Sequence, residues 1–397
     1  IDSGLQRNLD YLMSNAYSES GAEVVTAGVM EIKTGKILAM STYPSFNPNE
    51  RNISTFNNYF LEGTIECGSV FKPFIYADSI EEGKYDHNAY YNSGSYNVYY
   101  GNKLVATIKD HNGGQGWGTI TYDQGLYHSS NVAICNLLDQ GYVTKDVLTE
   151  KLNDLGFFQG DTMDGLTCSS SINAYTRKNA GRLEYLTTGF GQGSTVTPYQ
   201  LLKAYSVFGN DGKTVQPHIV DKVVYQATPK YSKQIFLTNT ISQVKDLMLG
   251  VIEDEQGTGK TYRLDNDVRM IGKTGTGQVV ENGGYSTTLY MHSFVGIAPY
   301  DDPQVVMFLT FKSGDSYAQY MPNIVKQTMN EALQVVNRYN AKNTTAVDQS
   351  CTLDSYTNQS VNYVKSKLES KSLSVQIIGN GSSVIEQYPL AKSKVTS

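Results

Sequence analysis

Segments with strand character lie toward both ends of the chain, and the long stretch between them is rich in helix patterns. Residues 24–40 form a hairpin pattern, in which two apolar runs flank the turn Lys33-Thr34-Gly35-Lys36. Apolar runs typical of strands return over residues 269–276, 293–297 and 304–311. Helix patterns cover residues 69–82, 121–138, 196–207, 241–252 and 324–339. Residues 84–118, with many Tyr, Asn and Gly, are expected to be irregular. This separation predicts an α+β fold whose antiparallel sheet is closed by segments distant in sequence.

The size and charge of the chain narrow the possible functions. With 397 residues, it is long enough for one large domain and a smaller one. The net charge of −6 and the lack of a long basic run argue against a nucleic-acid partner. No apolar run reaches about 18 residues, so no membrane-spanning helix is predicted. Because the sequence starts at Ile1 without a methionine, we expect that a native membrane anchor has been cut away.

The segment Ser69-Val70-Phe71-Lys72 places a hydroxyl and an amine three residues apart, with Pro73 directly behind. On the first turn of a helix these two side chains lie on one face. A neutral lysine there can take the serine proton and leave an oxygen nucleophile that attacks a carbonyl. The pattern is weak by itself, because serine and lysine are common residues.

Two further motifs follow in a meaningful order. Ser129-Ser130-Asn131 begins 60 residues after Ser69, and Lys273-Thr274-Gly275 lies far downstream. S-x-x-K, S-D-N and K-T-G together are the signature of penicillin-binding proteins and class A β-lactamases. Ser130 replaces the usual aspartate, but the chemistry of that motif is assigned to its first and third residues.

With these motifs placed, the chain resembles the transpeptidase domain of class B penicillin-binding proteins, the peptidoglycan D,D-transpeptidases, over roughly residues 1–340. The resemblance implies the fold shared with serine β-lactamases, in which an antiparallel sheet carries a helical subdomain. Further matches to the family occur at residues 1–6, 117–121, 191–193, 197–198, 272–276 and 294–299.

The end of the chain has a different character. Residues 341–360 are polar and predict a linker. Residues 361–397 combine a helix-like segment at 361–368 with a strand-like segment at 373–378, and they resemble a PASTA module through residues 375–381 and 387–389. We therefore expect a small α/β module here, and a sporulation-specific class B protein of a spore-forming Gram-positive bacterium.

The resemblance implies acyl transfer from peptidoglycan stem peptides that end in D-Ala-D-Ala. Ser69 would be the nucleophile and Lys72 the general base, with a pKa lowered by burial and by the nearby Lys273. Ser129 would pass a proton to the leaving amine, and Asn131 would hold Lys72 and a substrate amide. The substrate-binding residues implied in this way are Lys273, Thr274, Gly275 and Thr276, with the amides of Ser69 and Thr276 as the oxyanion hole.

The resemblance also implies partners and a location. β-Lactam antibiotics would acylate the same serine. A glycosyltransferase partner would supply the glycan strands, because no such segment is visible in this sequence. The site of action would be the extracytoplasmic face of the bacterial cell membrane.

One group of residues departs from the family pattern and suggests a metal. Cys67 precedes Ser69 by two residues, His128 directly precedes Ser129, and Asp110-His111 lies in the preceding loop. Cysteine, histidine and aspartate are favoured zinc ligands, and zinc usually takes four of them. We therefore consider a structural Zn²⁺ bound by Cys67, Asp110, His111 and His128. The alternative is a buried thiol and two ordinary histidines.

Other functions remain open from the sequence. A serine β-lactamase uses the same motifs but needs a carboxylate that activates water, and Glu150-Lys151-Leu152-Asn153 is one residue short of the E-x-x-L-N pattern. A D,D-carboxypeptidase would differ only in using water as the acceptor. A β-lactam sensor or a cell-wall-binding protein with an inactive site is a further alternative. The intact motifs argue against an inactive site.

Overall fold

The computed structural model describes residues 1–50, 57–221, 228–265, 267–281, 283–345, 351–369, 373, 375, 377–387 and 389–395. The chain forms two compact units, residues 1–335 and residues 336–397. The first unit contains the three sequence motifs.

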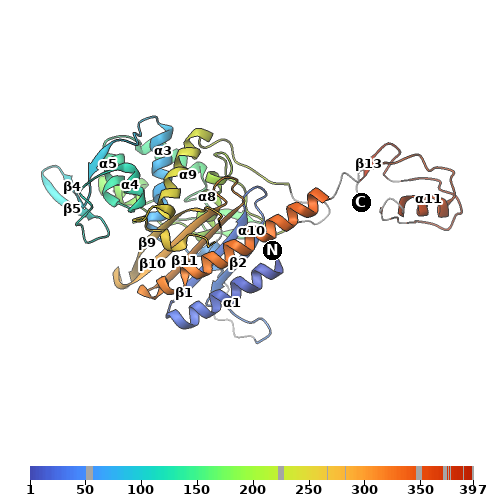
Figure 1. The fold of residues 1–397 in the computed structure, drawn as a ribbon, viewed down its shortest axis with the longest axis horizontal. Helices are drawn as coiled ribbons and strands as arrows, with labels where there is room; N and C mark the ends of the chain where they lie inside the picture. Colours follow the sequence, from blue (N-terminus) through green and yellow to red (C-terminus); the bar gives the residue numbers. More distant parts are fainter. Residues whose placement is uncertain are drawn as a thin grey trace. The chain divides into compact units, whose positions relative to one another are not determined.

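A five-stranded antiparallel sheet forms the centre of the first unit, in the order β2-β1-β11-β10-β9 (Figure 1). β1 pairs with β11 along its whole length, from Val24 opposite Lys312 to Glu31 opposite Val305. The N-terminal hairpin is thus joined to a strand from the far end of the unit. This confirms the predicted α+β fold. The strands are β1 (Val24–Glu31), β2 (Ile37–Tyr43), β9 (Ile271–Glu281), β10 (Gly284–Ala298) and β11 (Val305–Ser313).

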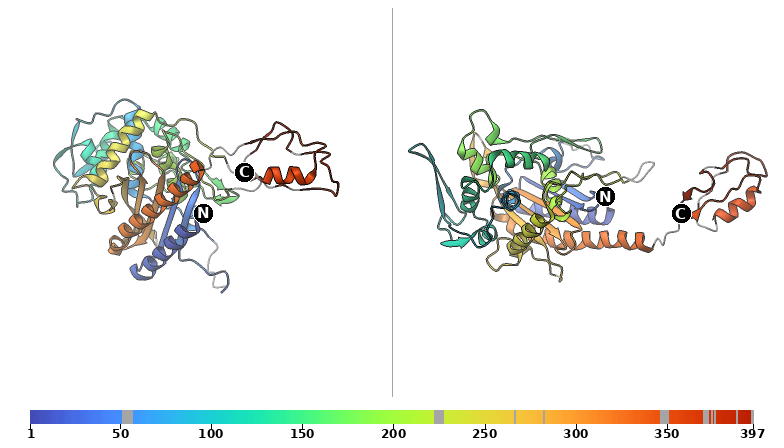
Figure 2. Two further views of the ribbon diagram at one scale, coloured as in Figure 1. Left: turned by 45° about the vertical axis from the view of Figure 1, so that its right-hand side comes forward. Right: turned by 90° about the horizontal axis from the view of Figure 1, so that it is seen from above.

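Two helices from the ends of the unit cover one face of this sheet. α1 (Ser3–Ser20) packs on β1 and β2, and α10 (Met321–Thr345) runs beside it (Figures 1 and 2). Asn8 of α1 donates a hydrogen bond to the Glu331 carboxylate of α10 at 2.6 Å. On the opposite face, α8 (Pro198–Tyr205) packs on β1 and β11. The sheet is therefore buried between helices.

The middle of the chain forms the helical region. Its helix α3 (Lys72–Glu81) is buried from Lys72 to Ile80. The Phe74 ring on this helix lies 5.1–5.3 Å from those of Phe157, Tyr205 and Phe208. Such dense packing fixes the helix that starts just after Ser69. The other helices of this region are α2 (Tyr59–Glu62), α4 (Tyr122–Tyr127), α5 (Asn131–Asp139), α6 (Lys145–Asp154), α7 (Arg182–Gly189) and α9 (Thr238–Glu253).

Two sequence predictions differ from the structure in this region. The helix predicted over residues 121–138 is broken, because α4 ends at Tyr127 and α5 begins at Asn131. Ser129, between them, has a φ of +58°, which a helix cannot contain. Residues 84–118, expected to be irregular, contain short paired strands. These are β3 (Tyr90–Asn92) with β6 (Thr119–Thr121), and β4 (Ser95–Tyr100) with β5 (Lys103–Lys109). A further hairpin joins β7 (Asp161–Met163) to β8 (Leu166–Cys168).

The second unit is small. It contains α11 (Val361–Glu369) and a short pair formed by β12 (Cys351–Thr352) and β13 (Lys394–Val395). Leu353, Tyr356 and Val364 form its core. The strand predicted over residues 373–378 lies partly outside the described residues, and its described positions are not assigned to a strand. Across all described residues of the chain, no helix has the length and apolar character needed to cross a membrane.

Candidate active site

Ser69 lies in the 3₁₀ turn η1 (Gly68–Phe71), which leads directly into α3. Gly68 has a φ of +61°, which disfavours residues with a side chain. A Cβ atom on Gly68 would lie 2.3 Å from the backbone oxygen of Thr276 on β9. The Gly68 amide donates a hydrogen bond to the Gly191 carbonyl at 3.0 Å. The turn that carries Ser69 is thus held between β9 and the Gly191-Gln192-Gly193 segment noted in the sequence.

Lys72 is the first residue of α3, and its side chain is fully buried. Its Nζ donates to the Ser129 carbonyl at 2.5 Å and to Oδ1 of Asn131 at 2.8 Å. The Ser129 Oγ lies 3.4 Å from the same nitrogen. The structure therefore brings the first two sequence motifs into contact.

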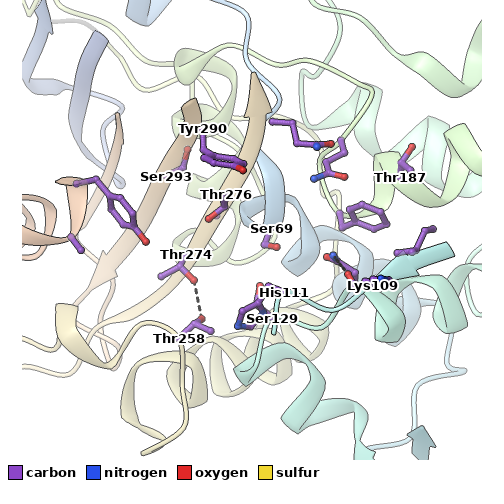
Figure 3. A pocket seen from close by; sticks show the side chains of 18 of the residues that line it. Ser69, Lys109, His111, Ser129, Thr187, Thr258, Thr274, Thr276, Tyr290 and Ser293 are labelled. Carbon is purple, nitrogen blue, oxygen red and sulfur yellow. Dashed lines mark hydrogen bonds between the residues drawn. The ribbon is translucent and has the colours of Figure 1, made fainter. Parts of the chain in front are cut away.

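Lys273 on β9 is also fully buried. Its Nζ donates to the Ser129 Oγ at 2.8 Å and to the Thr274 carbonyl at 2.9 Å. The Ser129 hydroxyl thus lies between two lysine side chains. The Thr274 hydroxyl donates to Oγ1 of Thr258 at 2.8 Å (Figure 3). The third motif is therefore part of the same site.

Burial changes the protonation of both lysines. Desolvation lowers the pKa of Lys72 from 10.5 to about 7, and the negative charge of Asp110 partly opposes this change. Burial also lowers the pKa of Lys273 well below its usual value, and the proximity of Lys72 lowers it further. Burial is thus the cause that lowers the pKa of Lys72, whereas the repulsion between the two lysines acts on the pKa of Lys273. The site favours states in which at least one lysine is neutral.

Asp110 organises the S-S-N motif. Its carboxylate is buried, and Oδ1 accepts hydrogen bonds from the Ser130 hydroxyl at 2.9 Å and from the amides of Asn131 and Val132 at 2.8 and 3.1 Å. Oδ2 accepts from the Gly94 amide at 2.8 Å. Amides at a helix N-terminus lack partners within the helix, so this carboxylate stabilises the start of α5. Asp110 thereby helps to set the positions of Ser129 and Asn131 on either side of Ser130.

The predicted zinc site of Cys67, Asp110, His111 and His128 is wrong. Within the described ranges, no group of three or more histidine, cysteine, aspartate or glutamate side chains is placed to hold a metal ion. The Asp110 oxygens are already used as acceptors by α5 and Gly94. Cys67 is buried, its thiol lies 3.8 Å from the Gly68 carbonyl, and burial raises the pKa of that thiol.

The two histidines pack against an aromatic ring instead. The Trp117 ring lies 4.6 Å from that of His128, nearly parallel at 9°, and 5.4 Å from that of His111. Burial lowers the pKa of both imidazoles, so neutral rings are favoured near pH 7. The sequence placed these residues near the catalytic motifs correctly, but their role here is packing.

A cleft of about 730 Å³ opens over the three motifs (Figure 3). In Figure 3, Thr274, Thr276 and Tyr290 follow one another along the β9 side, with Ser69 and Ser129 close by. None of the described residues that line the cleft is an aspartate or a glutamate. Several lining residues gave no signal in the sequence, because they come from a strand end, loops and helix ends without a motif: Lys109, Thr187, Phe190, Thr258 and Tyr317.

Comparisons with known proteins agree with this geometry. Residues 25–334 match the family described as "Penicillin binding protein transpeptidase domain". The chain is 28% identical to Stage V sporulation protein D of Bacillus subtilis (strain 168) over 423 residues, which cover 100% of the chain and 63% of that protein. It is 26% identical over 341 residues to the peptidoglycan D,D-transpeptidase FtsI homolog of Mesostigma viride, which covers 77% of the chain and 55% of that protein. The chain therefore spans less than two thirds of the length of these relatives.

A solved structure has the same fold. The TP domain of Burkholderia pseudomallei penicillin-binding protein 3, in its apo form, superposes with a TM-score of 0.72 at 23% identity. The match covers 85% of this chain and 96% of that one. Since the family match over residues 25–334 spans most of the chain and includes all three motifs, the chain belongs to the penicillin-binding protein transpeptidase family.

Proposed function

We propose that this chain is a serine D,D-transpeptidase domain that cross-links peptidoglycan stem peptides through an acyl-enzyme on Ser69. One observation carries the proposal. The Ser129 hydroxyl lies 2.8 Å from Nζ of Lys273 and 3.4 Å from Nζ of Lys72, at a cleft that Ser69 also lines. This arrangement supplies a base, a proton relay and a cation around one nucleophile.

Acylation follows from the state of Lys72. A lysine with an ordinary pKa is only about 0.03% neutral at pH 7, whereas a pKa of about 7 leaves about half of Lys72 neutral. Neutral Lys72 takes the Ser69 proton as Oγ attacks the carbonyl carbon of the penultimate D-alanine. The bond to the terminal D-alanine then breaks, and its nitrogen receives a proton through the Ser129 hydroxyl.

Substrate binding is assigned to β9 and to Asn131. Lys273 and Thr274 would bind the terminal carboxylate of the stem, and Gly275 would let the peptide approach the strand. The amides of Ser69 and Thr276 would stabilise the oxyanion, typically by about 3 kcal/mol for each donor. Asn131, which already accepts from Lys72 at 2.8 Å, would hold the base and a substrate amide in register.

The composition of the cleft bears on the fate of the acyl-enzyme. A fast β-lactamase needs a carboxylate that activates water, and the described lining of the cleft contains none. Glu150 lies on α6 and is not part of that lining. A long-lived acyl-enzyme is therefore favoured, and it awaits an amine acceptor. A D,D-carboxypeptidase, which uses water slowly, remains the alternative.

The setting of this activity is also part of the proposal. Similarity along the whole chain to a protein named Stage V sporulation protein D supports a role in cell-wall or spore-cortex synthesis. That role places the domain at the extracytoplasmic face of the membrane, with a glycosyltransferase partner. The separate compact unit at residues 336–397, with its helix α11, supports a PASTA-like module over residues 361–397.

The proposal is tested by the mass of the intact protein after exposure to penicillin. The wild type is expected to gain one drug molecule and to retain it for hours, while Ser69→Ala gains none. Incubation with a D-Ala-D-Ala peptide and an amine acceptor should then yield a cross-linked product. Rapid loss of the adduct would favour a hydrolase, and no adduct at all would refute the nucleophile assignment.

A further inference from the structure

A second cavity, of about 590 Å³, opens beside the catalytic cleft. Three of its residues also line that cleft, so the two spaces adjoin each other: Thr276, Tyr290 and Tyr317. The cavity forms where the pairing of β9 with β10 shifts register between Tyr285 and Tyr290. Thr287 lies in this irregular stretch, is exposed, and borders the opening.

His292 is the unusual residue of this cavity. The residue is only 4% exposed, yet neither ring nitrogen makes a hydrogen bond of normal geometry with a described residue, although the backbone of Ser313 and Gly314 lies close enough to raise its pKa. Its ring stacks on Tyr317, with centroids 3.6 Å apart and planes at 12°. A buried polar group without a partner is costly, unless water or a ligand supplies one. His292 therefore offers hydrogen-bonding capacity to whatever fills the cavity.

The charge of the cavity limits the choice of ligand. Burial lowers the pKa of His292 to about 4, although the Asp315 charge and the backbone of Ser313 and Gly314 oppose this change. The ring is thus neutral near pH 7, with one nitrogen that donates and one that accepts. Among the lining residues that the structure describes, the exposed Asp315 carries the one formal charge. The cavity suits a cationic amine and disfavours a carboxylate.

The position of the cavity relates it to the acyl-enzyme. His292 is the cross-strand partner of Thr276, so their side chains lie on the same face of the sheet. Thr276 supplies one amide of the proposed oxyanion hole. It lies two residues beyond Thr274, about 7 Å along the strand from the proposed carboxylate site. A flexible side-chain amine held in the cavity can reach an acyl carbon at Ser69 from there.

We propose that this cavity binds the amine-bearing residue of the acceptor stem peptide, an inference that rests on the proposed transpeptidase function. Asp315 attracts the ammonium group, and His292 forms hydrogen bonds with the same residue. The ammonium group first gives one proton to water, because only the neutral amine attacks. In the attack, a C–N bond forms at the acyl carbon and the C–O bond to Ser69 breaks. The second proton that the nitrogen loses passes to Ser69 Oγ.

The test compares two acceptors on the same acyl-enzyme, formed from a D-Ala-D-Ala peptide. D-Alanine is the leaving group of acylation, so its entry reverses its release and needs no second cavity. A tripeptide that ends in meso-diaminopimelate presents a side-chain amine and would use the cavity. Products of aminolysis and hydrolysis are quantified by mass spectrometry, and penicillin acylation is followed in parallel.

Three variants change the cavity in different ways. His292→Phe keeps the stack on Tyr317 but removes both nitrogens, Thr287→Trp fills the opening from an exposed position, and Asp315→Asn removes the charge. The first two should raise the tripeptide concentration for half-maximal aminolysis about tenfold, as expected for one lost buried hydrogen bond or a blocked subsite. Asp315→Asn should raise the tripeptide concentration for half-maximal aminolysis by about threefold, and by less at high salt. Asp301→Asn removes another exposed carboxylate outside the cavity and is the matched control.

The outcomes separate the inference from the function on which it rests. If the variants lose transfer to the tripeptide but keep transfer to D-alanine and penicillin acylation, the result supports the proposal that the cavity binds the acceptor. Wild-type values for the tripeptide in all variants, or equal losses for both acceptors, overturn it while transpeptidation stands. If His292→Phe does not fold, the result for Thr287→Trp decides whether the cavity binds the acceptor. If the wild type is acylated but transfers to neither acceptor, the proposed function fails and the inference fails with it.

Discussion

Replacing Asp110 with asparagine separates the structural and the electrostatic contributions of one buried carboxylate. The substitution keeps the shape but removes the charge and turns one acceptor atom into a donor. Four hydrogen bonds reach this carboxylate, three of them from the Ser130 hydroxyl and the first amides of α5. A hydrogen bond to a charged group is worth roughly 1 kcal/mol more than a neutral one, so we expect a loss of about 3 kcal/mol in the free energy of unfolding.

The same substitution should change the pH dependence of acylation. The negative charge of Asp110 raises the pKa of Lys72, against the larger effect of burial. Without that charge, the pKa of Lys72 falls below about 7. In the proposed mechanism acylation requires neutral Lys72, so the rising limb of the pH–rate profile should move to lower pH. A purely structural defect would lower the rate at every pH without moving the limb.

Urea denaturation and the rate of penicillin acylation between about pH 5 and 9 measure the two effects. Thr144→Ala is the control, because it removes the side-chain cap of α6, and Thr144 does not line the cleft. That variant should lose about 1 kcal/mol in the free energy of unfolding, and the rising limb of its pH–rate profile should stay at the wild-type pH. A limb that stays in place or moves to higher pH in Asp110→Asn would refute the electrostatic argument. A stability loss below about 0.5 kcal/mol would refute the capping argument.

Three further outcomes are expected from the site. In the wild type, the rate of penicillin acylation should rise with pH through about 7, because Lys72 loses its proton there; a flat profile would contradict this. Gly68→Ala should abolish acylation, because the new Cβ would lie 2.3 Å from the Thr276 oxygen. Gly83→Ala has a similar φ of +67° and no atom within 4 Å of the new Cβ, so it should cost only about 1–2 kcal/mol of stability and remain active. Prolonged treatment with a chelator should leave the acylation rate and the melting temperature unchanged, and a loss that added zinc restores would reinstate a metal site.

The sequence was sufficient to predict that the three motifs share one site, because the residues of each motif are contiguous. Ser69 and Lys72 share one turn, and Ser129 and Asn131 share another. Their residue types and spacing can therefore be recognised even where the surrounding secondary structure is predicted incorrectly. The central sheet could also be predicted from the sequence, because its strands appear as apolar runs near both ends of the unit. The structure adds what depends on distant segments, such as the contact of Gly68 with Thr276.

Asp110 shows why the remaining part of the site was misread. Its proximity to the S-S-N motif was expected, but its partners were taken to be a metal rather than backbone amides. Those amides exist as free donors only because the helix breaks at Ser129, whose φ is +58°. The predicted continuous helix over 121–138 hid this new N-terminus. Once the break is known, an adjacent buried carboxylate is explained by the donors at Asn131 and Val132.

In the proposed function, the two buried lysines connect substrate binding to the activation of the nucleophile. Both contact the Ser129 hydroxyl, and the pKa of Lys273 is lowered by burial and further by the charge of Lys72. In the proposed function, the carboxylate of the stem binds Lys273 and stabilises its charged form. Because two ammonium groups repel each other, a charged Lys273 favours the neutral form of Lys72, and the negative carboxylate opposes this effect less the farther it binds from Lys72. The substrate would thus increase the fraction of active base at the moment when its carbonyl reaches Ser69.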